Sequence, residues 1–163
     1  MKSLLLALLL VLAPSLIHAG EFPLADFVLI EKAERKLHLL REGEILKTFK
    51  IALGMRPVGD KQKEGDSKTP EGRYLLDMRN PDSDYFLSIH ISYPDVSDRR
   101  EAAALGLDPG GAIMIHGQPN VPTRSETYYR TQDWTDGCIA VSNSDMIDIW
   151  LMTGDNTPIE IRP

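Results

Sequence analysis

Apolar and polar residues alternate over several short stretches that begin after residue 26, and this pattern is typical of β-strands. A first group of strands is expected at Phe27–Ile30, at residues 37–39 and at residues 45–51. Polar turns at residues 33–35 and 41–44 separate these strands, which favours an antiparallel meander. His38 lies between two leucines, so its side chain is expected on the solvent side of the meander.

A second group of strands follows a polar loop at residues 55–68. One strand begins at Tyr74, and another over residues 86–93 places Ser88 and His90 on the face opposite Leu87, Ile89 and Ile91. An apolar strand over residues 112–115 would carry His116 at its end, and residues 158–161 form a last strand.

Two short helices accompany these strands. Asp98 and Glu101 resemble a capping box for a helix that ends at Gly106, and Ser142 or Asn143 caps a helix that ends at Gly154. Residues 118–133 show neither period, and we interpret them as a long irregular loop that could cover a site. The fold class is therefore predicted to be mainly β with short helices.

Residues 1–19 have the features of a secretory signal peptide. Lys2 precedes an apolar run over residues 4–13, and Ala19 stands at the expected cleavage position. The apolar run is short for a membrane span, so we expect cleavage and no stable membrane insertion, with an uncleaved anchor as the alternative. Residues 20–163 would then be one periplasmic domain, of a length that supports a single core.

The charge pattern argues against nucleic acid as a partner. The chain has 18 basic and 24 acidic residues and a net charge of −6, and no basic stripe interleaved with aromatic residues. The sequence does not specify an oligomeric state.

The candidate chemistry centres on Cys138, the single cysteine of the sequence, which directly follows Gly137. A thiol attacks as the thiolate and needs a base, and His116 after its apolar run is the candidate. Gly137 permits a sharp turn, in which the amides of Gly137 and Cys138 could bind an oxyanion. The alternative is that Cys138 is a small buried residue of a core strand.

A zinc site is a second alternative. It would use His90, His116 and Cys138, but these residues lie 26 and 22 positions apart and include no short ligand pair. No metal and no cofactor are therefore expected.

The ordered motifs resemble a known family. His116-Gly117, the run from Thr135 to Ile139, and the segment Thr69–Tyr74 are similar to the signature segments of the YkuD-type L,D-transpeptidases. The resemblance covers most of residues 27–161, and it implies a β-sandwich or barrel with the active-site cysteine next to a helix. The run Trp-Thr-Asp-Gly-Cys-Ile-Ala-Val is similar to a Gram-negative branch of the family that includes hydrolytic members. Two positions depart from the family pattern, because Asp136 stands where many members have His and Ala140 stands where many have Arg.

The resemblance also implies an activity. Cys138 would attack the carbonyl of a diaminopimelate residue in a peptidoglycan stem peptide and form a thioester, with His116 as proton acceptor. Residues expected to contact substrate are His90, Gly117, Thr135 and Asp136. An amine would resolve the thioester in a transpeptidase. Water would resolve it in an L,D-carboxypeptidase or in an amidase that releases wall-linked protein, and a non-catalytic wall-binding domain is a further alternative. Because Asp136 is a carboxylate, we expect it to raise the pKa of Cys138 and to make activation depend on His116.

Overall fold

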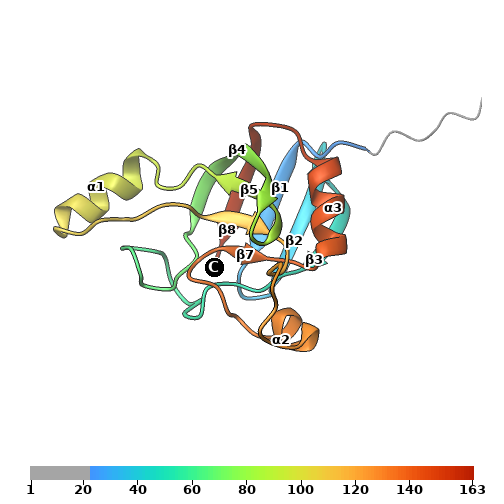
Figure 1. Cartoon of the computed structure of the whole chain (residues 1–163). Coiled ribbons are helices and arrows are strands. Elements are labelled where there is room, and N and C mark those ends of the chain that lie inside the picture. The colour runs from blue at the N-terminus through green and yellow to red at the C-terminus, as the bar shows by residue number, and fades with distance from the viewer. Residues whose placement is uncertain (1–22) are drawn as a thin grey trace, which may run out of the picture.

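The computed structural model describes residues 23–163, and the predicted signal peptide lies outside these residues. The chain builds eight strands and three helices, as Figure 1 shows. The strands are β1 (Phe27–Glu31), β2 (Lys36–Arg41), β3 (Glu44–Lys50), β4 (Gly72–Ser83), β5 (Phe86–Ile91), β6 (Met114–His116), β7 (Ile139–Ala140) and β8 (Thr157–Arg162). The helices are α1 (Val96–Ala104), α2 (Glu126–Thr131) and α3 (Asn143–Met152).

All eight strands form one sheet in the order β3-β2-β1-β8-β4-β5-β6-β7. The predicted meander is confirmed, since β1 and β3 each pair antiparallel with β2. The predicted last strand, β8, lies in the middle of the sheet, parallel to β1 and antiparallel to β4. The C-terminal strand therefore joins the N-terminal meander to the strands that carry His116 and Cys138.

The sheet curls until its two ends meet. Ala52, just after β3, and Ala140 of β7 exchange two backbone hydrogen bonds of 2.8 Å. Three residues after Ala52, the amide of Met55 donates to the carbonyl of Thr135 at 3.0 Å. These bonds bring the segment after β3 against the segment that ends in Cys138, so the fold is a curled, barrel-like sheet, as expected for a mainly β chain.

The helices confirm part of the sequence prediction and correct part of it. Helix α1 begins three residues earlier than expected, because Asp95 is the N-cap and forms the capping box with Asp98. Helix α3 is capped by Ser142. The segment 118–133 was expected to be irregular but contains α2, capped by Ser125. Six residues are too few to show a 3.6-residue period, which explains why the pattern did not reveal this helix.

The inside of the curled sheet is apolar. Fully buried side chains include Ile30, Leu37, Leu39, Leu53, Leu76, Ile89, Ile91, Ile115, Ile139, Met146, Ile149 and Ile159. The prediction that His38 faces solvent is wrong, because it is only 7% exposed. Its ring nitrogens contact Thr48 Oγ1 at 2.8 Å and Glu31 Oε2 at 2.9 Å, which supply the polar partners that a buried imidazole needs.

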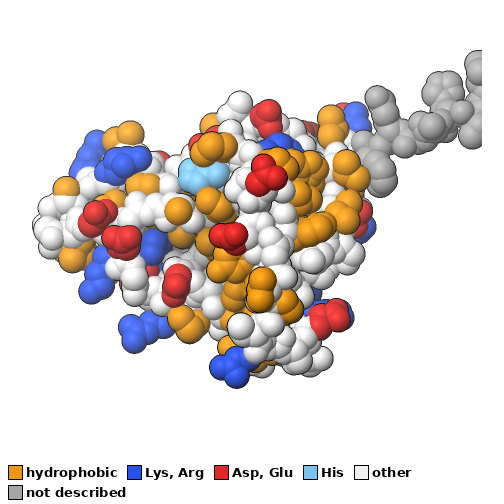
Figure 2. Space-filling model, in the orientation of Figure 1, with side chains coloured by type: hydrophobic (Ala, Val, Ile, Leu, Met, Phe, Trp, Pro, Cys, Tyr) orange, Lys and Arg blue, Asp and Glu red, His pale blue; other side chains and the backbone are white. Residues whose placement is uncertain are grey.

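The surface is mixed in character. On the face shown in Figure 2, acidic and basic side chains are interspersed, and hydrophobic side chains gather over α3. The exposed residues of α3 include Ile147 and Leu151. Among residues 23–163, no helix is long and apolar enough to cross a membrane.

Candidate functional site

A tight turn over residues 135–138 presents the cysteine. The hydroxyl of Thr135 donates to the carbonyl of Cys138 at 2.7 Å and accepts the amide of Gly137 at 3.1 Å. Thr135 is 5% exposed, so its side chain serves to hold this turn. The amides of Gly137 and Cys138 were both expected to bind an oxyanion. Since the Gly137 amide already donates to Thr135, the Cys138 amide is the remaining candidate.

The loop before β4 packs directly on this turn. Gly137 has a φ of 132°, and a Cβ there would stand 2.6 Å from the carbonyl oxygen of Lys68. A Cβ on Gly54 would stand 2.3 Å from the carbonyl oxygen of Ser67, and the Gly54 amide donates to Thr69 Oγ1 at 3.2 Å. The segment that begins at Thr69 was singled out by its resemblance alone. Its position shows a physical role, because it fixes the backbone against which the cysteine turn rests.

Cys138 is half-buried and borders a cavity of about 320 Å³. Its thiol lies 3.6 Å from the carbonyl oxygen of Ala112. Burial raises the pKa of the Cys138 thiol, a hydrogen bond from the Met114 amide lowers it, and the nearby Asp136 raises it further. As expected, Asp136 raises the pKa of Cys138, but burial raises it more.

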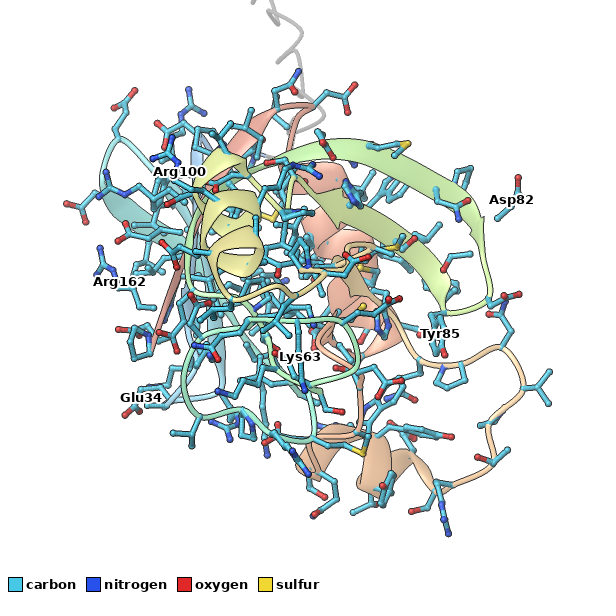
Figure 3. The ribbon with its side chains drawn as sticks, turned by 90° about the vertical axis from the view of Figure 1, so that its left-hand side faces the viewer. Glu34, Lys63, Asp82, Tyr85, Arg100 and Arg162 are labelled. Carbon is cyan, nitrogen blue, oxygen red and sulfur yellow. The ribbon has the colours of Figure 1, made fainter. Side chains whose placement is uncertain are left out.

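The cavity beside Cys138 is bordered by charged side chains. Asp136 and Glu64 contribute carboxylates to its wall, together with Lys61. Lys61 is buried, and its ammonium donates to Asp66 at 2.9 Å and to the carbonyl of Lys63 at 3.0 Å. Figure 3 shows Lys63 on the loop that runs in front of the sheet. The ion pair of Lys61 with Asp66 holds this loop in place. The carboxylates of Asp136 and Glu64 add negative charge to the cavity wall.

His116 ends β6 and is buried, with 4% of its surface exposed. Its Nδ1 lies 2.7 Å from the carbonyl oxygen of Gly117. A carbonyl oxygen can only accept, so Nδ1 carries the proton and Nε2 of the neutral ring is free to take one. Burial lowers the pKa of His116 to about 4, and the hydrogen bond to Gly117 raises it only in part. The imidazole is therefore neutral at neutral pH.

The sheet register brings the cysteine segment alongside the histidine. His116 pairs with Ala140 across the parallel β6–β7 ladder. Cys138 directly precedes β7 and lies two residues before Ala140, so the strand alternation, continued by one residue, would direct its side chain to the same side of the sheet as His116. Strand geometry gives a Cα–Cα separation of about 8 Å for such a diagonal pair. At this separation two inward-leaning side chains can approach each other or the same substrate group.

The glycine after the histidine is required by packing. A Cβ on Gly117 would stand 2.6 Å from Asn143 Oδ1 and 3.0 Å from the carbonyl oxygen of Tyr85. The same Asn143 oxygen accepts the amide of Gln118 at 2.8 Å. Asn143 thus ties the His-Gly segment to the start of α3, which places the helix next to the cysteine strand.

His90 shares the face of His116 but is not adjacent to the thiol. It pairs with Met114 across β5–β6, and Met114 stands between it and Cys138. The His90 Nδ1 contacts Asp77 Oδ1 at 2.6 Å. Within residues 23–163, no three side chains of His, Cys, Asp or Glu are grouped so that they could hold a metal ion.

An aromatic wall that was not predicted from the sequence covers the histidine. The His116 ring lies 4.6 Å from the Tyr85 ring and 5.6 Å from the Trp134 ring, measured between centroids. Tyr129 packs edge-on against Trp134 at 5.0 Å. The density of aromatic residues between 128 and 134 is the sequence signal that could have indicated this wall, whereas Tyr85 comes from the β4–β5 hairpin and has no such signal.

Two ion pairs that were also not predicted from the sequence hold the segments around the site in place. Asp133, next to the cysteine turn, accepts a two-point contact from Arg35 and the amide of Leu53. Lys32 is buried and donates to Glu71 at 2.7 Å and to the carbonyls of Gly59 and Thr69 at 2.9 Å. Because the partners lie up to 98 residues apart, no local pattern could have paired them.

Comparison with known proteins gives a family match over most of the chain. The model of the YkuD family, described as the L,D-transpeptidase catalytic domain, matches residues 25–161. YafK of Escherichia coli strain K12, named as a candidate L,D-transpeptidase, is 38% identical over 97 residues. That alignment covers 56% of this chain and 37% of YafK.

Solved structures with the same architecture are also found. Pgp2 of Campylobacter jejuni, described as a helical cell shape determining protein, superposes with a TM-score of 0.63 at 29% identity. The match covers 83% of this chain and 46% of Pgp2. Bd1075 of Bdellovibrio bacteriovorus matches with a TM-score of 0.58 at 26% identity, over 88% of this chain and 52% of that protein. The chain thus spans about half or less of the length of these relatives.

Proposed function

This chain belongs to the YkuD family of L,D-transpeptidase catalytic domains, and from that premise we propose that it transfers acyl groups of peptidoglycan stem peptides through a thioester on Cys138. The donor is a stem peptide that contains diaminopimelate. The residues that carry the chemistry are the nucleophile Cys138 and the base His116, with the amide of Cys138 as oxyanion donor.

In the first step the sulfur of Cys138 bonds to the carbonyl carbon of the diaminopimelate residue. The thiol proton passes to Nε2 of His116 as this bond forms, and the carbonyl π-electrons move to the oxygen. Because the pKa of Cys138 is raised and that of His116 is lowered, a resting thiolate–imidazolium pair is disfavoured. Proton transfer therefore accompanies attack, and substrate must be present before the thiolate develops.

In the second step the tetrahedral oxyanion collapses and the C–N bond breaks. The imidazolium of His116 returns its proton to the departing amine, which leaves as the neutral amine. An acceptor amine then attacks the thioester and a C–N bond forms. The imidazole of His116 takes a proton from this amine and passes it to the sulfur of Cys138 as the C–S bond breaks, so Cys138 departs as the thiol and the imidazole is neutral again. The observation that supports the proposal is the thiol of Cys138 at the wall of a cavity, with the β6–β7 register pairing His116 with the residue two positions beyond it.

Hydrolysis is the second candidate outcome. Cys138 is half-buried at a cavity whose wall includes the carboxylates of Asp136 and Glu64, and such a wall attracts water as well as amines. Water would then resolve the thioester, and the enzyme would act as an L,D-carboxypeptidase or as an amidase that releases wall-linked protein. Asp136 would bind substrate at this wall. His90, Gly117 and Thr135 were expected to contact substrate, and we assign Gly117 and Thr135 instead to holding the backbone of the site.

We also propose where the chain acts. Residues 1–19 would direct export, and residues 20–163 would act in the periplasm as one catalytic domain. Pgp2 is described as determining helical cell shape, and on that basis we propose a role for this chain in cell wall organisation and cell shape.

The test is incubation of the purified protein with defined muropeptides, followed by mass spectrometry. We expect loss of the residue after diaminopimelate, with an amine adduct for transpeptidation or a water adduct for hydrolysis. Cys138→Ala and His116→Gln should both lose turnover, because nucleophile and base act as one unit. Turnover by Cys138→Ala at the wild-type rate would contradict the thioester mechanism. Sacculus binding without turnover by the wild-type protein would instead indicate a wall-binding domain.

A further inference from the structure

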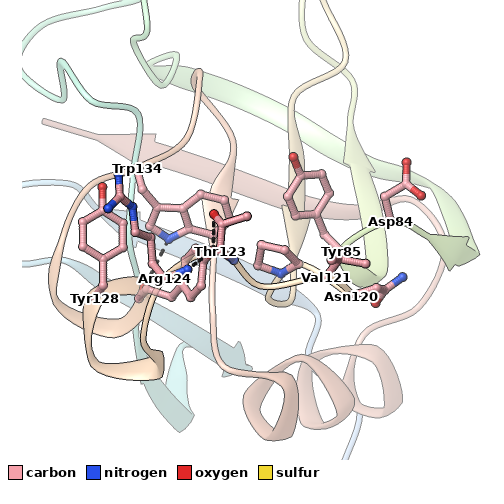
Figure 4. Close-up of a pocket in the computed structure, with 10 residues that line it drawn as sticks. Asp84, Tyr85, Asn120, Val121, Thr123, Arg124, Tyr128 and Trp134 are labelled. Atoms are coloured by element: carbon pink, nitrogen blue, oxygen red, sulfur yellow. Dashed lines mark hydrogen bonds between the residues drawn. The ribbon is translucent and has the colours of Figure 1, made fainter.

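A second cavity, of about 530 Å³, shares no lining residue with the Cys138 cavity. Two of its lining residues, Tyr85 and Trp134, are the ones whose rings pack against His116. The volume of the cavity is in the range of small-molecule sites. Figure 4 shows Asp84 and Tyr85 on one side of it and Arg124, Tyr128 and Trp134 on the other. The proposed catalytic steps use none of these five residues.

Aromatic rings with fixed positions form the walls of this cavity. The Tyr85 and Trp134 rings lie 6.0 Å apart, and the Trp134 Nε1 donates to the carbonyl of Tyr129 at 3.2 Å. Tyr128 packs edge-on against Tyr129 at 5.7 Å, and the guanidinium of Arg124 lies over the Tyr128 ring at 5.7 Å. These contacts between the rings fix their positions in the cavity wall.

Polar groups surround the rings and are free to bind. Tyr85 and Tyr128 are 40% and 37% exposed. Within the described residues, the carboxylate of Asp84 and the guanidinium of Arg124 form no ion pair. The cavity thus combines flat apolar faces with hydrogen-bonding groups at its rim.

Three main-chain amides that border the cavity are already hydrogen-bonded. The amide of Asn120 donates to the carbonyl of Asp84 at 2.9 Å, and the amides of Thr123 and Arg124 donate to the Tyr129 hydroxyl at 3.0 and 3.2 Å. An extended peptide that adds to a receptor as a strand binds through free main-chain groups. The three engaged amides disfavour that mode, and exposed rings beside a carboxylate and a guanidinium favour a ring-shaped ligand rich in hydroxyl groups.

We propose that this cavity binds a pyranose ring of an N-acetylated amino sugar, namely the glycan end of a stem-peptide substrate. The apolar face of the sugar would stack on Tyr128, which is 37% exposed, and its hydroxyl and acetamido groups would bond to Asp84 and Arg124. The identity of the glycan rests on the proposed function. The cavity is linked to the proposed site through His116, whose ring packs against the Tyr85 and Trp134 rings of the cavity wall.

Direct binding tests the subsite without catalysis. The Cys138→Ala protein is titrated by calorimetry with the disaccharide of N-acetylglucosamine and N-acetylmuramic acid, which carries no peptide. We expect saturable binding that weakens about tenfold in a Tyr128→Ala background, the size of a lost stacking contact. Tyr128→Phe should keep the affinity, and Ile147→Ala, an exposed apolar change on α3, serves as the control. No binding, or equal binding by all four proteins, would overturn the proposal.

A competition arm distinguishes the glycan from the peptide. A sugar-free stem tetrapeptide should not displace the disaccharide from the Cys138→Ala protein. Displacement that depends on Tyr128 would overturn the proposal and assign the cavity to the peptide. If the wild-type protein turns over no muropeptide but binds the disaccharide through Tyr128, the proposed catalysis fails and the sugar subsite stands. If turnover is found without disaccharide binding, the subsite fails and the catalysis stands.

Discussion

Acid should destabilise this protein through His116 in particular. The folded protein lowers the pKa of His116 from 6.5 to about 4 because burial disfavours the imidazolium. Between pH 6.5 and about 4, this histidine is protonated in the unfolded chain and neutral in the folded chain. Each pH unit across this window costs about 1.4 kcal/mol of unfolding free energy. The stability that a neutral His116 contributes is therefore complete above pH 6.5, and about 3 kcal/mol of it is lost as the pH falls to 4.

The measurement compares wild type with His116→Gln, which cannot titrate at this position. Urea unfolding followed by circular dichroism at several pH values between 7 and 4 gives the free energy of unfolding of each protein. The remaining titrating groups are common to both proteins and cancel in the difference. We expect the stability of wild type relative to His116→Gln to fall by about 3 kcal/mol over this range. A difference that stays constant from pH 7 to pH 4 would refute a neutral, buried His116.

The same pKa has a catalytic consequence. As the proposed base, His116 must be neutral in the free enzyme. The value of kcat/KM should therefore decrease on the acid side only as the pH falls through about 4. An acid limb near pH 6.5 would contradict the assignment of this histidine as the base.

Three further outcomes are expected. Gly137→Ala places a Cβ against the carbonyl oxygen of Lys68 at a φ of 132°. It should lower Tm by about 10 °C in a thermal melt, and an unchanged Tm would contradict the tight packing of the turn. Asp136→Asn should shift the pH profile of iodoacetamide alkylation of Cys138 to lower pH, because it removes a carboxylate that raises the thiol pKa; a shift to higher pH would show the opposite sign. Lys32→Met removes a buried ammonium with three acceptors and should lower the free energy of unfolding, measured in urea, by about 3 kcal/mol. Lys36→Met, an exposed control, should lower it by less than about 1 kcal/mol. Equal losses would show that burial of the Lys32 ion pair does not set its contribution.

Local signals in the sequence were sufficient for two of the described helices and for the described strands other than the two-residue β7. Period-2 alternation depends on side-chain direction within a strand, so the meander and β5 could be predicted from neighbouring residues. The N-cap of α1 was placed three residues too late, because Asp95 and Asp98 are equally suitable caps by residue type. Only the backbone at Asp95, which is extended rather than helical, distinguishes them.

The chemistry of the site was visible in part for the same reason. Gly137-Cys138 is a local signal, since a glycine before a nucleophile indicates a turn that other residues cannot adopt. His116 could be proposed from its position after an apolar strand, and the family resemblance linked the two. That their segments lie side by side depends on the register of β6 and β7, whose residues lie more than 20 positions apart.

The sequence by itself thus determined the strands, the signature turn and the family of this protein, because each depends on short-range backbone preferences or on ordered motifs. Tertiary structure alone decided the environment of each group. It inserted β8 between the two halves of the sheet, closed the sheet through Ala52 and Ala140, and buried His116 under Tyr85 and Trp134. A pKa, an ion pair and a cavity depend on which distant segments exclude water together, and that exclusion exists only after the chain has folded.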